Sequence, residues 1–260
     1  MQKSAISELY SYPLKGLNGQ QVSVVEIQKN NMFPLDRIFA IENNNNKFNE
    51  LDPTHFKKTA FLVLMKYEKL ALLQTTYNHE TNILTIKVNN EIVAKGNIQE
   101  SKGRETIELF FLKYMKFTKD QAVRIVSAEN HNFSDIKEKY VSIINLETIK
   151  SLSEIAGFYI DPIRFRANIY LKNLDPWEEV SWLNKAILSK SSELLGIREI
   201  SRCAATNVNP KTGDRDINIP NLLLKNFGHM NCGIYAQVTK GGFLKKNDTL
   251  TIKEFSSDYF

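Results

Sequence analysis

The sequence predicts a mixed α+β protein dominated by β-structure, with a barrel-like N-terminal domain followed by a second β-rich domain that carries peripheral helices. Three observations support this prediction. Short runs of alternating apolar and polar residues recur through residues 1–126 and favour strands. Apolar residues at helical spacing occur in two longer segments, 102–115 and 142–157. Towards the C-terminus, GIREISRCAATNV and GIYAQV are rich in β-branched residues, which again favours strands.

The composition sets the broad class. At 260 residues the chain can form one large domain or two modest ones, and 42% hydrophobic with 24% charged residues is typical of soluble globular proteins. The net charge of +5 comes from dispersed lysines, so it indicates mild attraction to anions and no nucleic-acid-binding surface. No apolar run is long enough to span a bilayer, and the N-terminus lacks the apolar core of a signal peptide. Two cysteines suggest no disulfide framework, so we expect a reducing, cytoplasmic setting.

The N-terminal half begins with three predicted strands. Residues 4–12 alternate loosely and end at Pro13, which closes the first strand. The second strand is QVSVVEIQ, in which apolar and polar residues alternate clearly. Arg37 opens the third, RIFAIE, which ends in an Asn-rich turn.

The next segment completes the first predicted domain. From Lys69, three strands follow each other through short turns, in LALLQTTY, ILTIKV and EIVAKGNI. The spacing of apolar residues from Lys102 to Met115 then predicts a helix. We therefore place a β-rich domain at residues 1–120.

Residues 121–260 form the second predicted domain, with the boundary in the loop around 118–140. VRIVSAE predicts a strand, and a helix follows with Asn145 as its N-cap and Gly157 at its end. FRANIYLKN predicts another strand, and a further one lies near Lys185–Leu188.

Both cysteines lie in residues 196–238. In this segment two predicted strands flank an excursion, NPKTGDRDINIP, that leaves and re-enters a sheet. Nearby positive charge favours a thiolate, which is a nucleophile or a soft metal ligand. The alternative is that each cysteine is a small buried apolar residue. The cationic and imidazole side chains around Cys203 and Cys232 are Arg198, Arg202, Arg215 and His229.

Several common catalytic motifs are absent from the sequence. It holds no GxxxxGK[ST] loop, GxGxxG fingerprint, CxxC, HExxH or GxSxG motif, and its four histidines are scattered. The usual nucleotide-binding, zinc and serine-hydrolase classes therefore have no support in the sequence.

Four motifs in the C-terminal half resemble the MOSC domain, the C-terminal domain of molybdenum-cofactor sulfurase. They are FRANIYL, DPWEEVSWLNKAILS, SRCAATNVNPKTGDRD and FGHMNCGIYAQV. YPLKGLNG and DRIFAIE in turn resemble the β-barrel domain that precedes MOSC in many members. The resemblance covers essentially the whole chain and implies an N-terminal MOSC-type β-barrel followed by a MOSC β-barrel domain. The functional relatives that it implies are the amidoxime reducing component and its bacterial counterparts.

The resemblance also implies a molybdenum cofactor of the molybdopterin type, with Lys15, Arg37, Arg166 and Asn168 lining its site. The chemistry is suitable, because arginine offers a rigid fork to phosphate, lysine a point charge, and asparagine a paired donor and acceptor. Arg166 and Asn168 lie two apart in a predicted strand, so we expect them to face one side. The alternative is that Arg37 and Arg166 are ordinary charges at strand edges.

For the metal, the resemblance implies one cysteine ligand placed downstream of the cysteine in SRC. Cys232 lies 29 residues after Cys203, a separation that resembles the family's, so we expect Cys232 to bind molybdenum. The alternative is that Cys203 is the functional thiol, so both cysteines are catalytic candidates. His229 is a candidate for orienting substrate or water, or else an ordinary solvated side chain.

The resulting expectation is a molybdenum-cofactor-dependent oxidoreductase that reduces N-hydroxylated or related N-oxygenated small molecules. Nothing in the sequence suggests a flavin, haem or iron–sulfur site, so a separate electron-transfer protein must supply the electrons. Two alternatives remain open. One is a cysteine-persulfide carrier for the assembly of metal–sulfur centres, and the other is a non-enzymatic module that binds the molybdenum cofactor.

Overall fold

Eight strands form the main sheet of the computed structural model, which describes residues 4–43, 48–118, 121 and 123–254. Their order is β15-β11-β12-β13-β9-β10-β1-β2. β9 and β10 run parallel, and all other neighbours in this sheet run antiparallel. The strands are β1 (Ala5–Ser11), β2 (Gln20–Val22), β9 (Val141–Asn145), β10 (Ile169–Lys172), β11 (Lys185–Leu188), β12 (Glu193–Ser201), β13 (Asn231–Lys240) and β15 (Thr251–Glu254).

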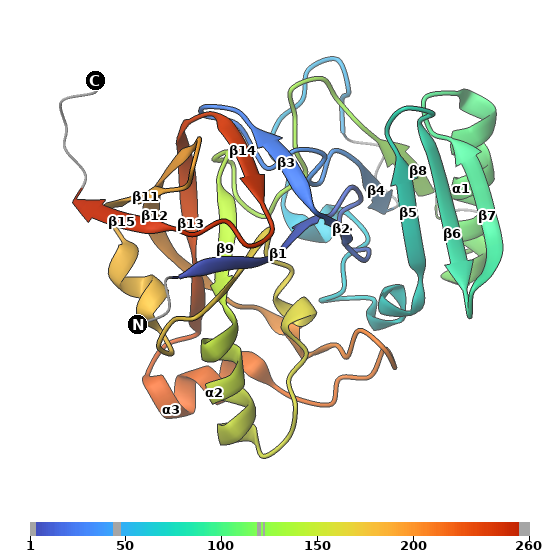
Figure 1. Cartoon of the computed structure of the whole chain (residues 1–260). Coiled ribbons are helices and arrows are strands. Elements are labelled where there is room, and N and C mark those ends of the chain that lie inside the picture. Colours follow the sequence, from blue (N-terminus) through green and yellow to red (C-terminus); the bar gives the residue numbers. More distant parts are fainter. Residues whose placement is uncertain (1–3, 44–47, 119–120, 122, 255–260) are drawn as a thin grey trace.

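The main sheet curls so that the segment before β15 lies beside β1 (Figure 1). The amide of Ile6 donates to Asp248 O at 2.9 Å, and the amide of Leu250 donates to Ser4 O at 2.9 Å. Inside the curve lies an apolar core that includes Leu9 and Trp182. Within the described residues the strand pairing does not close into a complete barrel, but the β-dominated α+β class is confirmed.

A second core lies under a smaller layer in the N-terminal half. Here β4 (Ala40–Asn43) pairs with β8 (Val123–Val126), and β5 (Gln74–Asn78), β6 (Ile83–Val88) and β7 (Glu91–Asn97) form a separate sheet. The helix α1 (Ser101–Tyr114), predicted at 102–115, packs against this sheet at one end of the molecule (Figure 1). Gly103 permits the contact, because a Cβ there would lie 1.9 Å from Asn97 O.

The predicted second strand is divided in the structure. QVSVVEIQ breaks at Ser23, so that β2 joins the main sheet while β3 (Val24–Ile27) pairs with β14 (Gly242–Lys245). The prediction of one continuous strand was therefore wrong. β1 also pairs with β10, so the first three strands form their hydrogen bonds with the C-terminal half and with each other. The division into domains at residue 120 stays a prediction, and strand pairing crosses it.

Two helices cover the base of the main sheet (Figure 1). The first, α2 (Leu146–Ala156), has the predicted caps: the Asn145 side chain accepts from the Glu147 amide at 3.0 Å, and Gly157 is left-handed with φ 76°. The second, α3 (Ile219–Phe227), lies in and beyond the segment predicted as an excursion and was missed, although Asn218 caps it and Gly228 ends it. Short 3₁₀ helices occur at Lys58–Ala60, Glu68–Leu72, Pro162–Phe165, Glu178–Trp182 and Ala204–Asn207.

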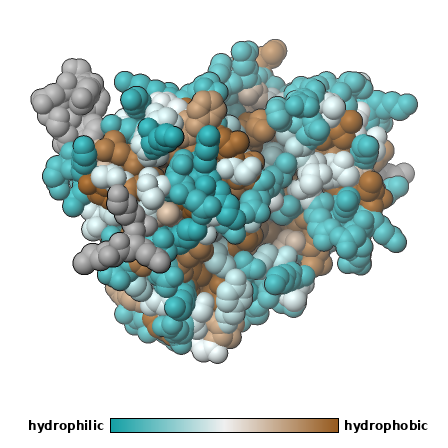
Figure 2. All heavy atoms as spheres, in the orientation of Figure 1, coloured by the Kyte–Doolittle hydropathy of each residue, from teal (hydrophilic) through white to brown (hydrophobic). Residues whose placement is uncertain are grey.

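One face of the molecule carries mainly polar residues (Figure 2). Figure 2 shows hydrophilic residues over much of the visible face, with apolar residues in separate patches between them. Of the helices in the described residues, none has the length and apolar composition that crossing a lipid bilayer requires.

The shared strand pairing yields a prediction about the isolated second half. A fragment of residues 121–260 lacks β1 and β3, so β14 loses its partner, β10 keeps only β9, and the core loses Ile6 and Leu9. We expect this fragment to show no cooperative unfolding transition in urea, measured by near-UV circular dichroism against the full chain. A cooperative transition and native-like near-UV signal for the fragment would show that the second half folds by itself.

Candidate functional site

A cavity of about 350 Å³ lies between segments of both halves of the chain. Seven of its lining residues are basic and three are acidic, so the cavity carries excess positive charge. Its volume is within the range of small-molecule sites, roughly 300–1,000 Å³. The charged residues are Lys15, Arg37, Lys58, Arg164, Arg166, Arg198 and Arg202, with Asp36, Asp135 and Glu199.

Arg37 and Arg166 come together at the inner end of the cavity. Both have left-handed backbones, with φ of 51° and 53°, which is uncommon outside glycine and asparagine. Arg37 Nη2 donates to Arg166 O at 3.0 Å, and both guanidinium groups contact the Tyr12 ring, at 4.6 and 4.5 Å from its centroid. Burial lowers the pKa of Arg37, but the adjacent carboxylate of Asp36, its ion-pair partner, raises it overall.

Arg166 has no such partner. Its Nη1 donates to Leu17 O at 2.5 Å, but no ion pair of the described residues includes it. Burial and the nearby positive charge of Arg37 lower its pKa to about 10. An anion in the cavity would stabilise the charged guanidinium and so oppose this lowering of the pKa, because it would supply a counter-charge.

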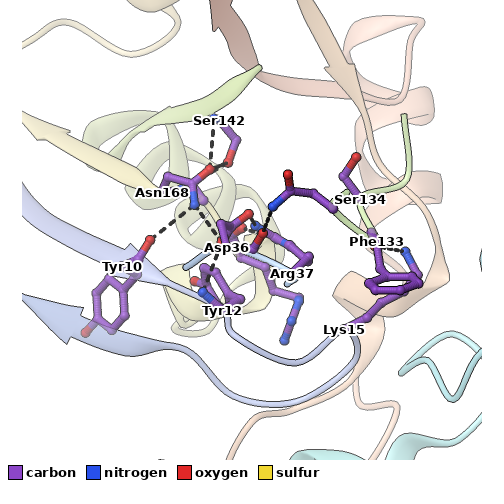
Figure 3. A network of polar contacts seen from close by, with 12 residues as sticks. Tyr10, Tyr12, Lys15, Asp36, Arg37, Phe133, Ser134, Ser142 and Asn168 are labelled. Carbon is purple, nitrogen blue, oxygen red and sulfur yellow. Dashed lines mark hydrogen bonds and ion pairs between the residues drawn. The ribbon is translucent and has the colours of Figure 1, made fainter. Parts of the chain in front are cut away.

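Asn168 connects this cluster to the sheet (Figure 3). Its Nδ2 donates to Asp36 Oδ1 at 2.9 Å and to Tyr10 O at 3.2 Å. Its Oδ1 accepts from the amide and hydroxyl of Ser142 at 3.1 and 2.8 Å. These four bonds use both donors and both lone pairs of the side-chain amide. In this arrangement Asn168 positions the cluster, and its role in contacting a cofactor stays a prediction.

Lys15 lies at another part of the cavity wall and is only 5% exposed. Its Nζ donates to Phe133 O at 2.8 Å and to Asp135 at 2.5 Å, and Lys58 Nζ lies 3.6 Å from the second oxygen of that carboxylate. Burial lowers the pKa of Lys15 although Asp135 opposes this. Burial alone would raise the pKa of Asp135, but Lys15 outweighs it and the pKa falls to about 2. This part of the wall therefore holds a charged cluster.

The two cysteines have different surroundings. Cys203 is partly exposed and lines the cavity, at the start of the short helix that follows β12. Lys58 lies beside it: burial lowers the pKa of Lys58, but Asp135 and Cys203 raise it overall. Cys232 is 1% exposed, packs in the core under α2 and α3, and does not line the cavity. Burial raises the pKa of its thiol to about 12.

Two buried nitrogens of cavity-lining arginines have no hydrogen-bond partner among the described residues. Arg202 donates through Nε to Cys232 O at 2.8 Å and through Nη1 to Phe165 O at 2.9 Å, which leaves its Nη2 unpaired. Nε of Arg164 is also unpaired, although its terminal nitrogens bind Asn207 O and Asp216. Arg164, Arg166 and Arg202 all line the cavity, and their positive charges make it suitable for an anionic ligand.

The structure thus brings five of the six sequence-predicted site residues to one cavity and leaves out Cys232. The reason given for two of them was wrong, because Arg166 and Asn168 precede β10, which begins at Ile169. Arg37 likewise precedes its strand, β4. His229 does not line the cavity; its ring lies 6.2 Å from Trp177, and its Nδ1 accepts from the amide of Asn231.

Asp36, Lys58 and Asp135 are among the site residues that were missed in the sequence. Asp36 stands next to Arg37 in DRIFAIE, and that adjacent carboxylate was the one available signal. Lys58 and Asp135 had none, since each lies far in sequence from the residues it contacts.

Fold and site together define a β-dominated protein with a cation-rich cavity that holds one accessible thiol. A family model described as the MOSC domain matches residues 116–251, and one described as the MOSC N-terminal beta barrel domain matches residues 3–128. The chain therefore belongs to the MOSC domain family, as the resemblance predicted. No curated protein matches it.

Several solved structures are similar to the chain. The YUAD protein of Bacillus subtilis aligns over 98% of both chains, with 12% identity and a TM-score of 0.47. YiiM of Geobacillus stearothermophilus aligns over 46% of this chain and 56% of its own, with 16% identity and a TM-score of 0.36. YiiM of Escherichia coli aligns over 45% of this chain and 56% of its own, with 18% identity and a TM-score of 0.34. These likenesses are too distant to carry a function across.

The contrast between the thiols gives a direct prediction. In the native protein at pH 8, a thiol reagent such as DTNB should modify one cysteine per chain, Cys203, because Cys232 is buried and its raised pKa keeps it protonated. After unfolding, both should react. Cys203→Ser should abolish the native reaction, whereas Cys232→Ser should leave it unchanged. Rapid native modification of Cys203→Ser would show that Cys232 is accessible.

The low pKa of Asp135 predicts a pH dependence. A carboxyl group whose pKa is lowered by folding contributes stability above its unfolded pKa, about 3.9, and this is lost as the pH falls towards 2. Wild type should therefore be more stable than Asp135→Asn at pH 5, and the difference should shrink towards pH 2. Urea unfolding at several pH values measures it. Asp52→Asn, at an exposed site, is the control; a gap that stays constant with pH would contradict the assignment.

Proposed function

We propose that this protein is a molybdenum-cofactor-binding oxidoreductase that reduces N-hydroxylated or related N-oxygenated compounds. One observation carries the proposal: the accessible thiol of Cys203 and the guanidinium of Arg166, which has no ion pair among the described residues, line the same cavity. Membership of the MOSC family supports it. We place the protein in the cytoplasm, with electrons supplied by a separate redox protein.

The residues present fit a molybdopterin-type cofactor. Its phosphate requires cationic donors, and the cavity is lined by Arg202 and by Arg166, which has no ion pair among the described residues. A molybdenum ion requires a soft ligand, which the Cys203 thiolate provides. When bound, the cofactor supplies the redox chemistry that removes oxygen from the substrate.

The chain's own part in this chemistry is to bind and orient. Asp36 and Tyr12 hold the guanidinium of Arg37, and Arg37 in turn fixes the backbone of Arg166. Lys58 lies beside Cys203 on the cavity wall. Cys203 is therefore our proposed metal ligand. The expectation for Cys232 stays open to test, and its burial away from the cavity does not favour it.

One alternative has an observation of its own. A partly exposed cysteine beside an ammonium group also suits a persulfide carrier, which hands a sulfur atom on and needs no resident cofactor. A persulfide on Cys203 would be detected as one added sulfur atom in the mass of the intact protein, removable by a reducing agent.

The test is the molybdenum and pterin content per chain after purification from a host that makes the cofactor. Wild type should carry both, and Arg166→Ala should lower its affinity for the cofactor about tenfold, because a charge-assisted contact is lost. Cys203→Ser should lose most of its activity per bound pterin. Cys232→Ser should keep that activity and lose only stability, about 1–3 kcal/mol for an unpaired buried hydroxyl.

The outcomes separate the readings. Wild type without molybdenum or pterin would overturn the proposal, and a persulfide on Cys203 would then favour the sulfur carrier. If the protein binds the cofactor but reduces no N-hydroxylated compound when a reduced dye donates the electrons, it is a non-enzymatic cofactor-binding module. If Cys232→Ser lost its activity and Cys203→Ser kept it, the ligand would be Cys232.

A further inference from the structure

A row of polar side chains crosses the sheet along the cavity. Arg198 on β12 lies directly opposite Tyr235 on β13, and Tyr235 lies opposite Ser142 on β9. Ser142 bonds to Asn168, just before β10. Residues directly opposite each other in antiparallel strands share a face of the sheet, and all four line the cavity. The row therefore forms one wall of the cavity.

The two ends of this row differ in exposure. At the inner end, Asn168 is buried and bonds to Asp36, next to Arg37. At the outer end, the side chain of Arg198 is 51% exposed. A ligand anchored at the inner end therefore leaves the outer end open to solvent and to a second molecule.

Arg198 is held over an aromatic surface and is only weakly paired. Its guanidinium carbon lies 5.6 Å from the centroid of Tyr235, and the ring of Tyr140 lies 6.2 Å from that of Tyr235. Its ion-pair partner Glu138 is 3.7 Å away and 52% exposed. An exposed pair at that distance contributes little, so an incoming anion can displace Glu138.

We infer that Arg198, Tyr235 and Tyr140 form a substrate subsite for a planar aromatic compound that carries a carboxylate. The guanidinium fork matches the two oxygens of a carboxylate, and the tyrosine rings offer faces and edges to an aromatic ring. For its place in a reaction this inference rests on the proposed function. The substrate class would then be aromatic N-hydroxylated compounds with an acidic group.

Binding tests the subsite without any turnover. Titration calorimetry of the full chain with benzoate should show binding, and benzamide, which has the same shape but no charge, should bind at least about tenfold more weakly. Arg198→Met should weaken benzoate about tenfold or more for the same reason. Glu138→Gln should strengthen it about twofold, because a competing carboxylate is removed. Tyr235→Leu should weaken it through loss of the ring contact.

Two results would overturn the inference. One is the absence of benzoate binding to wild type; the other is equal binding to wild type and Arg198→Met, which would put benzoate at the Arg37–Arg166 cluster instead. Since Arg198 is half-exposed, its variant should keep the wild-type thermal transition, which excludes misfolding as the cause. Failure of the proposed function would be a separate result. In that case the purified protein would lack molybdenum, but benzoate would still bind to wild type and bind more weakly to Arg198→Met.

Discussion

The buried carboxylate of Asp36 is the interaction on which the arrangement of the site depends. It is 1% exposed and accepts from the Tyr12 amide and from Asn168 Nδ2, each at 2.9 Å, as well as from the guanidinium of Arg37. A buried charge is stable only when it is paired and hydrogen-bonded, so these three donors are fixed relative to one another. They come from three segments that are distant in sequence. Through Ser142, Asn168 extends the same order to β9.

This arrangement also explains why the cavity suits an anion. Two guanidinium groups, those of Arg37 and Arg166, lie near the single carboxylate of Asp36. This carboxylate forms its ion pair with Arg37. Arg166 is held close by through the Tyr12 ring and the Leu17 carbonyl, neither of which carries a full negative charge. The positive charge of Arg166 is therefore left for a ligand to neutralise. The left-handed backbones of Arg37 and Arg166 fit this view, because such conformations persist where the surrounding contacts fix them.

Local patterns predicted local structure, and long-range pairing lay beyond them. The Asn145 cap and Gly157 define α2, and the β11 bounds agree with the predicted Lys185–Leu188, because these signals act within a few residues. The predicted strand breaks at Ser23 because β2 pairs with β1 and β3 pairs with β14. The alternation of apolar and polar residues does not indicate which partner a strand will have. In the site, the resemblance supplied Lys15, Arg37 and Arg166. The Lys15–Asp135 pair spans 120 positions, and only the folded chain brings it together.

The two thiols differ in burial and in their position relative to the cavity. Regular alternation along β13 would put Cys232 on the face of Ile234, inside the main sheet, and opposite to that of Tyr235. Gly233, with φ 75°, interrupts the alternation, and Cys232 packs in the separate core under α2 and α3. It does not line the cavity, although Ile144 of that core lies two residues after the cavity-lining Ser142 in β9 and so shares its face of the sheet. Cys203 is partly exposed and lines the cavity, whereas Cys232 is 1% exposed and lies outside the cavity lining.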